Sequence, residues 1–193
     1  MSYHGISCHT VLEYNVLTKV KINMHKIYTW TYKFILSNYK LYDVKFIVDS
    51  MLGSLAKYLR FMGYDTYYVK NNVKDDEILE ICKRENRILI TRDYELSKKC
   101  DNSIYIDDIK LDKQIKFLIK KLNLNLDNAL SRCSLCNTEL IKIDKENVKD
   151  LVPINVYNSI NEFYYCTNCK KVYWFGSHTK NIIKRLEEIK NDC

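Results

Sequence analysis

Two cysteine pairs with the same internal spacing constrain the fold of this chain more than any other feature. Cys133 and Cys136 form one CxxC pair, Cys166 and Cys169 form the other, and 29 residues separate the two pairs. A CxxC turn places both sulfur atoms on one side of a tight loop, and two such turns complete a tetrahedral set of four thiolates around zinc. The separation exceeds the usual spacing of about 15 to 20 residues. The predicted zinc ribbon therefore carries an insertion, which contains Pro153.

Redox-active pairs or disulfides are the alternative interpretation of these four cysteines. Both pairs lie in polar, turn-forming contexts, CSLCN and CTNCKK, which favours a structural zinc ion. The other four of the eight cysteines stand alone in the sequence. Among these, Cys82 falls within an apolar helical pattern, which indicates a small core residue rather than a ligand.

From Val44 onward, short apolar runs alternate with helical patterns. Leu52, Leu55 and Leu59 recur at helical spacing after the first run, and Gly63 is typical of a helix end. The pattern predicts strands at 45–49, 66–69, 87–91 and 103–107, and helices at 54–63, 75–86, 94–100 and 111–122. Strands that alternate with helices form a parallel sheet with right-handed crossovers. We therefore expect an α/β, Rossmann-like domain of three layers, in which helices flank a parallel sheet.

The two cysteine pairs follow this pattern in the last part of the chain. Strand-like runs occur at 162–165 and 172–175, and Ile182, Ile183, Leu186 and Ile189 form the apolar stripe of a helix predicted at 178–190. The expected organisation has three parts: an N-terminal extension of unknown structure at 1–43, the α/β domain at 44–125, and a small zinc ribbon with a C-terminal helix at 126–193.

Acidic residues follow the predicted strands at the edge where an open parallel sheet binds its ligands. Asp49 closes the first strand, Asp93 follows the third, Asp107 and Asp108 close the fourth, and Asp75, Asp76 and Glu77 begin the second helix. If the first and third strands are neighbours, Asp49 and Asp93 face each other. Clustered carboxylates repel one another unless a cation lies among them, and such oxygen ligands suit Mg²⁺ or Mn²⁺. A cation of this kind can activate water for attack on phosphorus.

Most of these acids also have a structural interpretation. Asp75 or Asp76 suits a helix N-terminus, and Asp107 and Asp108 suit a turn. Asp49 is the hardest to explain structurally, because it ends an otherwise apolar strand. The sequence contains no glycine-rich phosphate loop, which disfavours nucleotide binding of the P-loop or dinucleotide kind.

The net charge of +7 fits two kinds of surface. The parts 1–43, 44–125 and 126–193 carry +3, +3 and +1, so the charge is compatible with a polyanionic partner or with an ordinary solvated surface. No stretch approaches the roughly 18 apolar residues of a membrane span, and the N-terminus lacks the pattern of a signal peptide. We expect a soluble, cytoplasmic protein that does not bind membranes.

Several ordered segments together resemble a known family. FIVDSMLGSLAKYLRFMGYD, DDEIL, RILITRD, RCSLCN and EFYYCTNCKKVYWFGSH are similar to the Mut-seven C-terminal RNase family, a PIN-like nuclease domain with a C-terminal zinc ribbon. The resemblance covers residues 45 to about 180. It implies metal-dependent cleavage of RNA that leaves 5′-phosphate and 3′-hydroxyl ends. It places Asp49, Asp76 and Asp93 at the positions of the family's catalytic, metal-binding acids, with Asp75 as a rival for Asp76.

The resemblance leaves residues 1–43 unexplained. One hypothesis is that Val44 corresponds to a valine-type start codon and that residues 1–43 result from an upstream start. A peptide from residues 1–40 in the native protein would contradict this hypothesis.

Basic and aromatic side chains are candidates for contacts with RNA. Lys57, Arg60 and Arg92 are predicted to contact phosphates. In the ribbon, Arg132, Trp174, His178 and Lys180 suit stacking and charge contacts with RNA, although Tyr173 and Trp174 also suit the ribbon core. A solvated surface is the alternative for each of these charges.

The predicted function is that of a metal-dependent endoribonuclease with a structural Zn²⁺ and a catalytic Mg²⁺ or Mn²⁺. A non-catalytic nucleic-acid-binding protein or adaptor that uses the zinc ribbon is the main alternative. A phosphohydrolase of small substrates is disfavoured, because the sequence has no loop to hold a phosphate.

Overall fold

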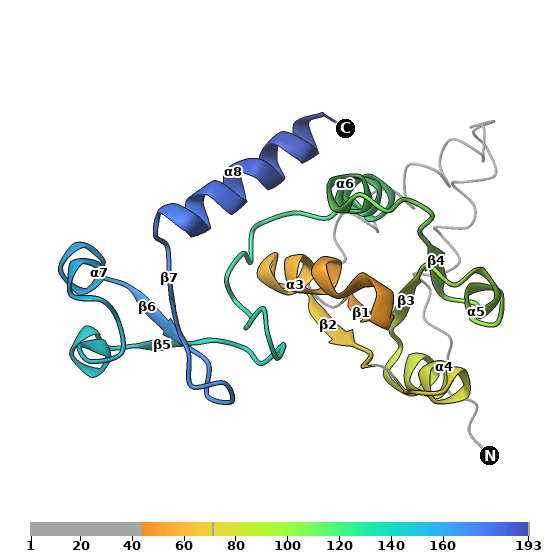
Figure 1. Ribbon diagram of the computed structural model, residues 1–193, viewed down its shortest axis with the longest axis horizontal. Helices are drawn as coiled ribbons and strands as arrows, with labels where there is room; N and C mark the ends of the chain where they lie inside the picture. Colours follow the sequence, from red (N-terminus) through yellow and green to blue (C-terminus); the bar gives the residue numbers. More distant parts are fainter. Residues whose placement is uncertain (1–43, 71, 193) are drawn as a thin grey trace, which may run out of the picture. The chain divides into compact units, whose positions relative to one another are not determined.

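The computed structural model describes residues 44–70 and 72–192. The part expected to form the α/β domain contains β1 (Lys45–Val48), η2 (Ser50–Leu52), α3 (Gly53–Phe61), β2 (Asp65–Tyr68), α4 (Asp75–Glu85), β3 (Ile88–Thr91), α5 (Tyr94–Lys98), β4 (Ser103–Tyr105) and α6 (Leu111–Leu122). The rest forms β5 (Ile141–Ile143), η3 (Lys145–Val148), α7 (Ile154–Ser159), β6 (Phe163–Tyr165), β7 (Val172–Trp174) and α8 (Ser177–Asn191) (Figure 1).

The first sheet is parallel and has the strand order β2-β1-β3-β4. Val48 of β1 lies opposite Tyr68 of β2 on one side and Ile90 of β3 on the other. The chain moves outward from β1 to β2 and then crosses to β3 on the opposite side of β1, so the strand order reverses between β1 and β3. The first and third strands are thus neighbours, which was the condition for Asp49 and Asp93 to lie near each other. Their carboxyl ends meet at the point where open α/β sheets bind ligands.

Helices cover both faces of this sheet. On one face, side chains of β1, β3 and β4 share a hydrophobic cluster with α3 and α6, and it includes Phe46, Val48, Leu55, Leu59, Ile90, Ile104 and Leu118. On the other face, a second cluster joins the sheet to α4 and α5, and it includes Ile47, Leu89, Ile78, Cys82 and Leu96. The predicted three-layer α/β fold is therefore confirmed, and Cys82 is a buried core residue as predicted.

Special backbone positions end the helices on this framework. The C-terminal caps of α4 and α6 are Asn86 and Asn123, with φ of 50° and 51° in the left-handed region that asparagine tolerates. Gly63 follows α3 with φ of 98°, and a Cβ there would lie 2.4 Å from the carbonyl oxygen of Asn128. Glycine is required at this turn for both reasons.

A second, antiparallel sheet has the order β5-β6-β7, in which β5 and β6 belong to the insertion between the cysteine pairs and β7 follows the second pair. Phe163 of β6 lies opposite Ile143 and Trp174 and packs with Val148 and Val152 in a small core of its own. Pro153 occupies the N-cap position of α7, where a helix needs no backbone N–H donor. The sequence pattern did not predict β5, η3 or α7, because short elements show too few apolar residues to reveal a period.

The last helix connects the zinc-ribbon part with the parallel sheet. Leu186 of α8 is fully buried in the same cluster as Leu118 of α6 and Leu55 of α3. Arg185 of α8 forms an ion pair with Asp112 of α6, with 2.6 Å between Nη2 and Oδ1. The cluster around Leu55 and Leu118 thus extends across the boundary expected at residues 125 and 126, and that boundary stays a prediction.

Within the described ranges, no helix is both long and apolar enough to cross a membrane. The extension at 1–43, and with it the hypothesis of an upstream start, lies outside the described residues.

Candidate active site and zinc centre

The four cysteines predicted to bind zinc come together in two loops of the same geometry. In the first loop, Cys133 N–H donates to Thr138 O and Cys133 O accepts from Asn137 N–H, at 2.8 and 2.9 Å. In the second, Cys166 N–H donates to Lys171 O and Cys166 O accepts from Lys170 N–H, both at 2.9 Å. Asn137 and Lys170 hold the same place in their loops, and both have positive φ. The two loops are equivalent and have the geometry of zinc knuckles, and we call them the first and second zinc knuckle.

The sulfur atoms fit a zinc ion. All four Sγ atoms lie within 4.8 Å of one another, and the pairs Cys133–Cys169 and Cys136–Cys166 are 3.8 and 3.4 Å apart. A tetrahedral zinc site with bonds of about 2.3 Å has sulfur atoms about 3.8 Å apart. The same cysteines are free thiols, so the disulfide alternative does not describe them. The Tyr173 hydroxyl lies 3.0 Å from Cys133 Sγ, and such outer contacts orient metal ligands.

The first knuckle is attached to the free edge of the parallel sheet at β2. The Asn137 side chain accepts a hydrogen bond from Thr66 N–H at 2.9 Å and donates to Asp65 Oδ1 at 2.8 Å. Buried Arg60 of α3 donates to Thr66 O and to Leu135 O, at 2.8 and 2.7 Å. Burial lowers the pKa of the Arg60 guanidinium, and its donors point at carbonyl groups. Arg60 is therefore placed to join α3, β2 and the knuckle, rather than to meet the RNA phosphate that the sequence predicted for it.

A second site lies at the carboxyl edge of the parallel sheet, where Asp49 follows β1. Asp49 is only 6% exposed, and its carboxylate accepts hydrogen bonds from Met51 N–H at 2.8 Å and from Arg92 N–H at 2.9 Å. The Thr91 hydroxyl donates to the same carboxylate. These contacts fix both oxygens of Asp49 at the end of the sheet.

Thr91 also connects Asp49 with Asp93. The Asp93 N–H donates to Thr91 Oγ1 at 2.8 Å, while the Asp93 carboxylate caps α5 by accepting from Leu96 N–H at 3.0 Å. Thr91 was not among the site residues predicted from the sequence. The only signal was a hydroxyl residue at the end of an apolar strand, immediately before Arg92 and Asp93.

Asp49 and Asp93 line one cavity of about 140 Å³, which we call the acidic cavity. Asp75, the first residue of α4, lines it as well, whereas Asp76 is exposed and is not among its lining residues. Lys99 lies 3.2 Å from the Asp75 carboxylate. Of the two rival acids, the structure thus brings Asp75 to Asp49 and Asp93.

The remaining acids take the structural positions that the sequence allowed. Asp107 accepts from the Tyr105 hydroxyl, and Asp108 accepts from Lys110 N–H in the turn before α6. Neither lines the acidic cavity. Within the described ranges, the four cysteines are the only group of three or more possible metal ligands whose ligand atoms all lie within 4.8 Å of one another. The three aspartates of the acidic cavity are therefore more widely spaced than the cysteine sulfur atoms.

The residues predicted to contact RNA lie in different environments. Arg92 is half-buried beside Asp49, and its Nε atom has no hydrogen-bond partner in the part of the chain that the structure describes. Arg132 is held inside the first knuckle by Asn137 O and Glu139, and Trp174 packs edge-to-face on Phe163. Lys57 on α3, and His178 and Lys180 on α8, are exposed.

Comparison with known proteins agrees with this combination of a parallel sheet and a four-cysteine site. The Mut7-C RNAse domain family matches residues 44–186, which is most of the chain. The chain belongs to the Mut7-C RNAse domain family. The predicted resemblance is thereby confirmed, and the match includes both the acidic cavity and the zinc knuckles.

A human protein named "Exonuclease mut-7 homolog" is a relative of this Mut7-C RNAse domain. The two are 27% identical over 115 residues, which cover 55% of this chain and 13% of the human protein. The chain therefore spans a small fraction of that relative. The family and the relative together indicate a nuclease, which is a hydrolase that acts on nucleic acid.

Proposed function

We propose that this Mut7-C RNAse domain is a metal-dependent ribonuclease that cleaves RNA internally. One observation carries the proposal: Asp49, Asp75 and Asp93 line a single cavity at the point where the strand order of the sheet reverses. Ligands of open α/β sheets bind at this point. The family supplies RNA as the substrate class.

The donor set of the acidic cavity fits a hard divalent cation. Three aspartates line it, and because Mg²⁺ or Mn²⁺ binds through few protein carboxylates plus waters, the wide spacing of these acids still allows one or two of them to hold such a cation. A cation held there would supply Lewis-acid stabilisation for the hydrolysis of a phosphodiester. Asp49 is the proposed main ligand, because the N–H groups of Met51 and Arg92 hold its carboxylate in place.

Asp93 and Asp75 complete the proposed set. Asp93 begins α5 and Asp75 begins α4, so both stand at helix N-termini that open onto the cavity. Asp75 replaces Asp76 in the proposal because Asp76 does not line the cavity.

Arg92 and Lys57 are the proposed phosphate contacts. Arg92 directly precedes Asp93 in the sequence, its backbone N–H donates to Asp49, and its side-chain Nε has no hydrogen-bond partner among residues 44–70 and 72–192. Lys70 also lines the acidic cavity and adds a further cationic group. Zinc, in this proposal, is structural, because four thiolates leave no open coordination position.

A cleavage assay on circular and linear RNA tests the proposal. We expect wild-type protein with Mn²⁺ to cut a circular single-stranded RNA, which has no end for an exonuclease. Asp49→Asn and Asp93→Asn are expected to lower the rate by on the order of 10²-fold or more. Cutting of linear RNA alone would contradict internal cleavage. Equal rates in wild type and variants, or none in either, would contradict the nuclease itself.

The second candidate is a non-catalytic RNA-binding protein or adaptor. It is favoured by one observation: Asp49 and Asp93 each cap a helix, so both have a structural reason to be present. In that case wild-type protein binds RNA, the circle stays intact, and Asp49→Asn alters only stability.

A further inference from the structure

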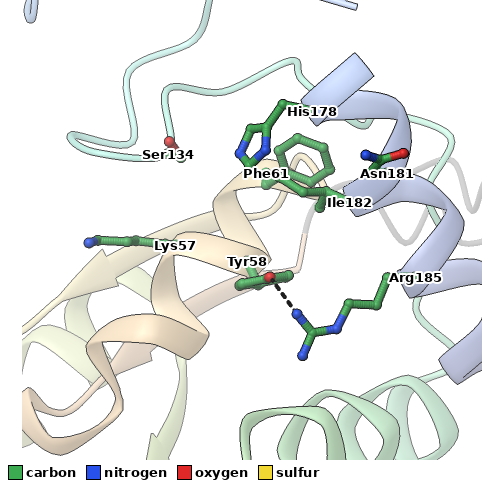
Figure 2. A pocket seen from close by; sticks show the side chains of 8 residues that line it. All are labelled: Lys57, Tyr58, Phe61, Ser134, His178, Asn181, Ile182 and Arg185. Atoms are coloured by element: carbon green, nitrogen blue, oxygen red, sulfur yellow. Dashed lines mark hydrogen bonds between the residues drawn. The ribbon is translucent and has the colours of Figure 1, made fainter. Parts of the chain in front are cut away.

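A second cavity, larger than the acidic one, lies between α3 and α8. It has a volume of about 400 Å³, and Ser134 of the first zinc knuckle is among its lining residues (Figure 2). We call it the α3–α8 cavity. Neither the acids of the proposed reaction nor the zinc ligands line it.

Its lining combines apolar and basic side chains. Tyr58, Phe61 and Ile182 provide the apolar part, and Lys57, His178 and Arg185 surround it, as Figure 2 shows. Arg185 is already paired with Asp112 and lies near the Tyr58 hydroxyl. Lys57 makes no ion pair within the described residues, so its charge is available to a ligand. A ligand with a flat apolar body and an anionic group matches this lining.

The position of the cavity relates it to the proposed reaction. Met51 of η2 lines the acidic cavity, and Lys57 lies six residues further along the chain on α3, which follows η2 directly. At a rise of about 1.5 to 2.0 Å per residue in these two kinds of helix, this is roughly 10 Å along the chain. Stacked nucleotides advance by about 3.4 Å each, so the distance corresponds to roughly three nucleotides.

We infer that the α3–α8 cavity binds one nucleotide of a single-stranded RNA whose scissile bond lies in the acidic cavity. The base packs against Tyr58, Phe61 and Ile182, and the phosphate meets Lys57. This inference rests on the proposed function. A single strand is the class of substrate, because a base can enter a pocket only when it is unstacked and unpaired. The volume lies within the range of about 300 to 1,000 Å³ of small-molecule sites.

Binding measurements on the full chain test the inference without relying on cleavage. The chain carries Asp49→Asn so that RNA survives the measurement, and the probes are a labelled single-stranded RNA of twelve nucleotides and its duplex. Lys57→Ala is compared with Lys83→Ala, which removes the same charge from an exposed position on α4, the helix on the other face of the sheet. Asn181→Trp, at an exposed position that lines the cavity, places an indole ring at its mouth.

We expect Lys57→Ala to weaken single-strand binding about three- to tenfold and to lower the salt dependence by about one phosphate contact. Lys83→Ala is expected to change the affinity for the single strand less than twofold. Asn181→Trp is expected to weaken single-strand binding but not duplex binding. Equal affinities for the two lysine variants, unchanged binding by Asn181→Trp, or no binding of single-stranded RNA would overturn the inference.

The same measurements separate this inference from the proposed function. If protein that retains Asp49 does not cleave RNA, but RNA binding depends on Lys57, the proposed nuclease activity is overturned and the nucleotide site is not. Cleavage by that protein, with equal binding by the two lysine variants, would overturn only the nucleotide site.

Discussion

Thr91 is the residue on which the geometry of the proposed active site depends most. Its hydroxyl donates to the Asp49 carboxylate and accepts from the Asp93 N–H, so one buried side chain sets the positions of two acids. Thr91 is a positioning residue in this account, because it contacts the carboxylates rather than the substrate.

Thr91→Val tests that role, because valine keeps the shape and removes the hydroxyl. We expect a loss of about 1–3 kcal/mol in the free energy of unfolding, since a buried N–H and a buried carboxylate lose a partner. We also expect at least about a tenfold loss of RNA cleavage. Thr91→Ser keeps the hydroxyl and should restore most of the cleavage rate. A Thr91→Val protein as active as wild type would contradict the role.

The Asp65 carboxylate makes the stability of the fold depend on pH. Burial by itself raises the pKa of Asp65, but hydrogen bonds from Arg87 and Asn137 outweigh it and hold that pKa below its ordinary value. The folded state therefore favours the ionised carboxylate. The resulting stability is complete above the unfolded pKa of about 3.9 and is lost as the pH falls through the lower, folded value.

Urea unfolding of wild type and Asp65→Asn at pH 7, 5 and 3 checks this expectation. The advantage of the wild type should be the same at pH 7 and 5 and should shrink at pH 3. An advantage that grows as the pH falls would show that the sign is wrong.

At the scale of elements, the first zinc knuckle covers the free edge of the parallel sheet at β2. β2 is the outermost strand on its side, and the Asn137 side chain takes the place of a neighbouring strand by accepting from Thr66 N–H. The side chains of Asn137 and Arg60 thereby link the knuckle to the edge of the sheet, and we expect zinc binding to be coupled to that edge, although the metal ligands lie in another part of the sequence.

Hydrogen exchange after zinc removal tests this coupling. A chelator should speed exchange of the Thr66 amide, because the knuckle loses its fixed shape without the metal. The Leu89 amide in the centre of the sheet donates to Asn102 O and serves as the control. If both amides respond equally, the sheet unfolds as a whole, and if neither responds, the knuckle holds its shape without zinc.

The limits of sequence-based prediction are clear at this scale. The strands and helices of the parallel sheet were predictable because their apolar residues are periodic, and the cysteines were predictable because their spacing is specific. The bonds of Asn137 to β2 and of Arg60 to Leu135 join residues more than 70 positions apart, and no local pattern signals them. The choice between Asp75 and Asp76 depends on the rotation of α4 about its axis, which adjacent acids in a sequence do not reveal.

At the scale of the whole described region, α8 holds the zinc-ribbon part against the sheet layers. Leu186 is buried in the cluster that includes Leu118 of α6 and Phe46 of β1, which gives the two parts of the chain one shared core. Ile182 of the same helix also lines the α3–α8 cavity, so the proposed nucleotide site exists only when α8 is docked.

Leu186→Ala measures what this docking contributes. We expect a loss of about 2–5 kcal/mol in the free energy of unfolding, because a fully buried leucine leaves a cavity. Lys190→Ala on the exposed side of α8 is the control and should change the value by less than about 0.5 kcal/mol. A Leu186→Ala cost as small as that of the control would mean that α8 is dispensable for the sheet core.

The most direct test of the central claim compares two neighbouring acids. Asp75→Asn and Asp76→Asn make the same chemical change in the first turn of α4, but only Asp75 lines the acidic cavity. With Mn²⁺ and single-stranded RNA, we expect Asp75→Asn to cleave at least about tenfold more slowly than wild type, as Asp49→Asn does, and Asp76→Asn to remain close to wild type. Equal rates for Asp75→Asn and Asp76→Asn, or a greater loss in Asp76→Asn, would contradict the account.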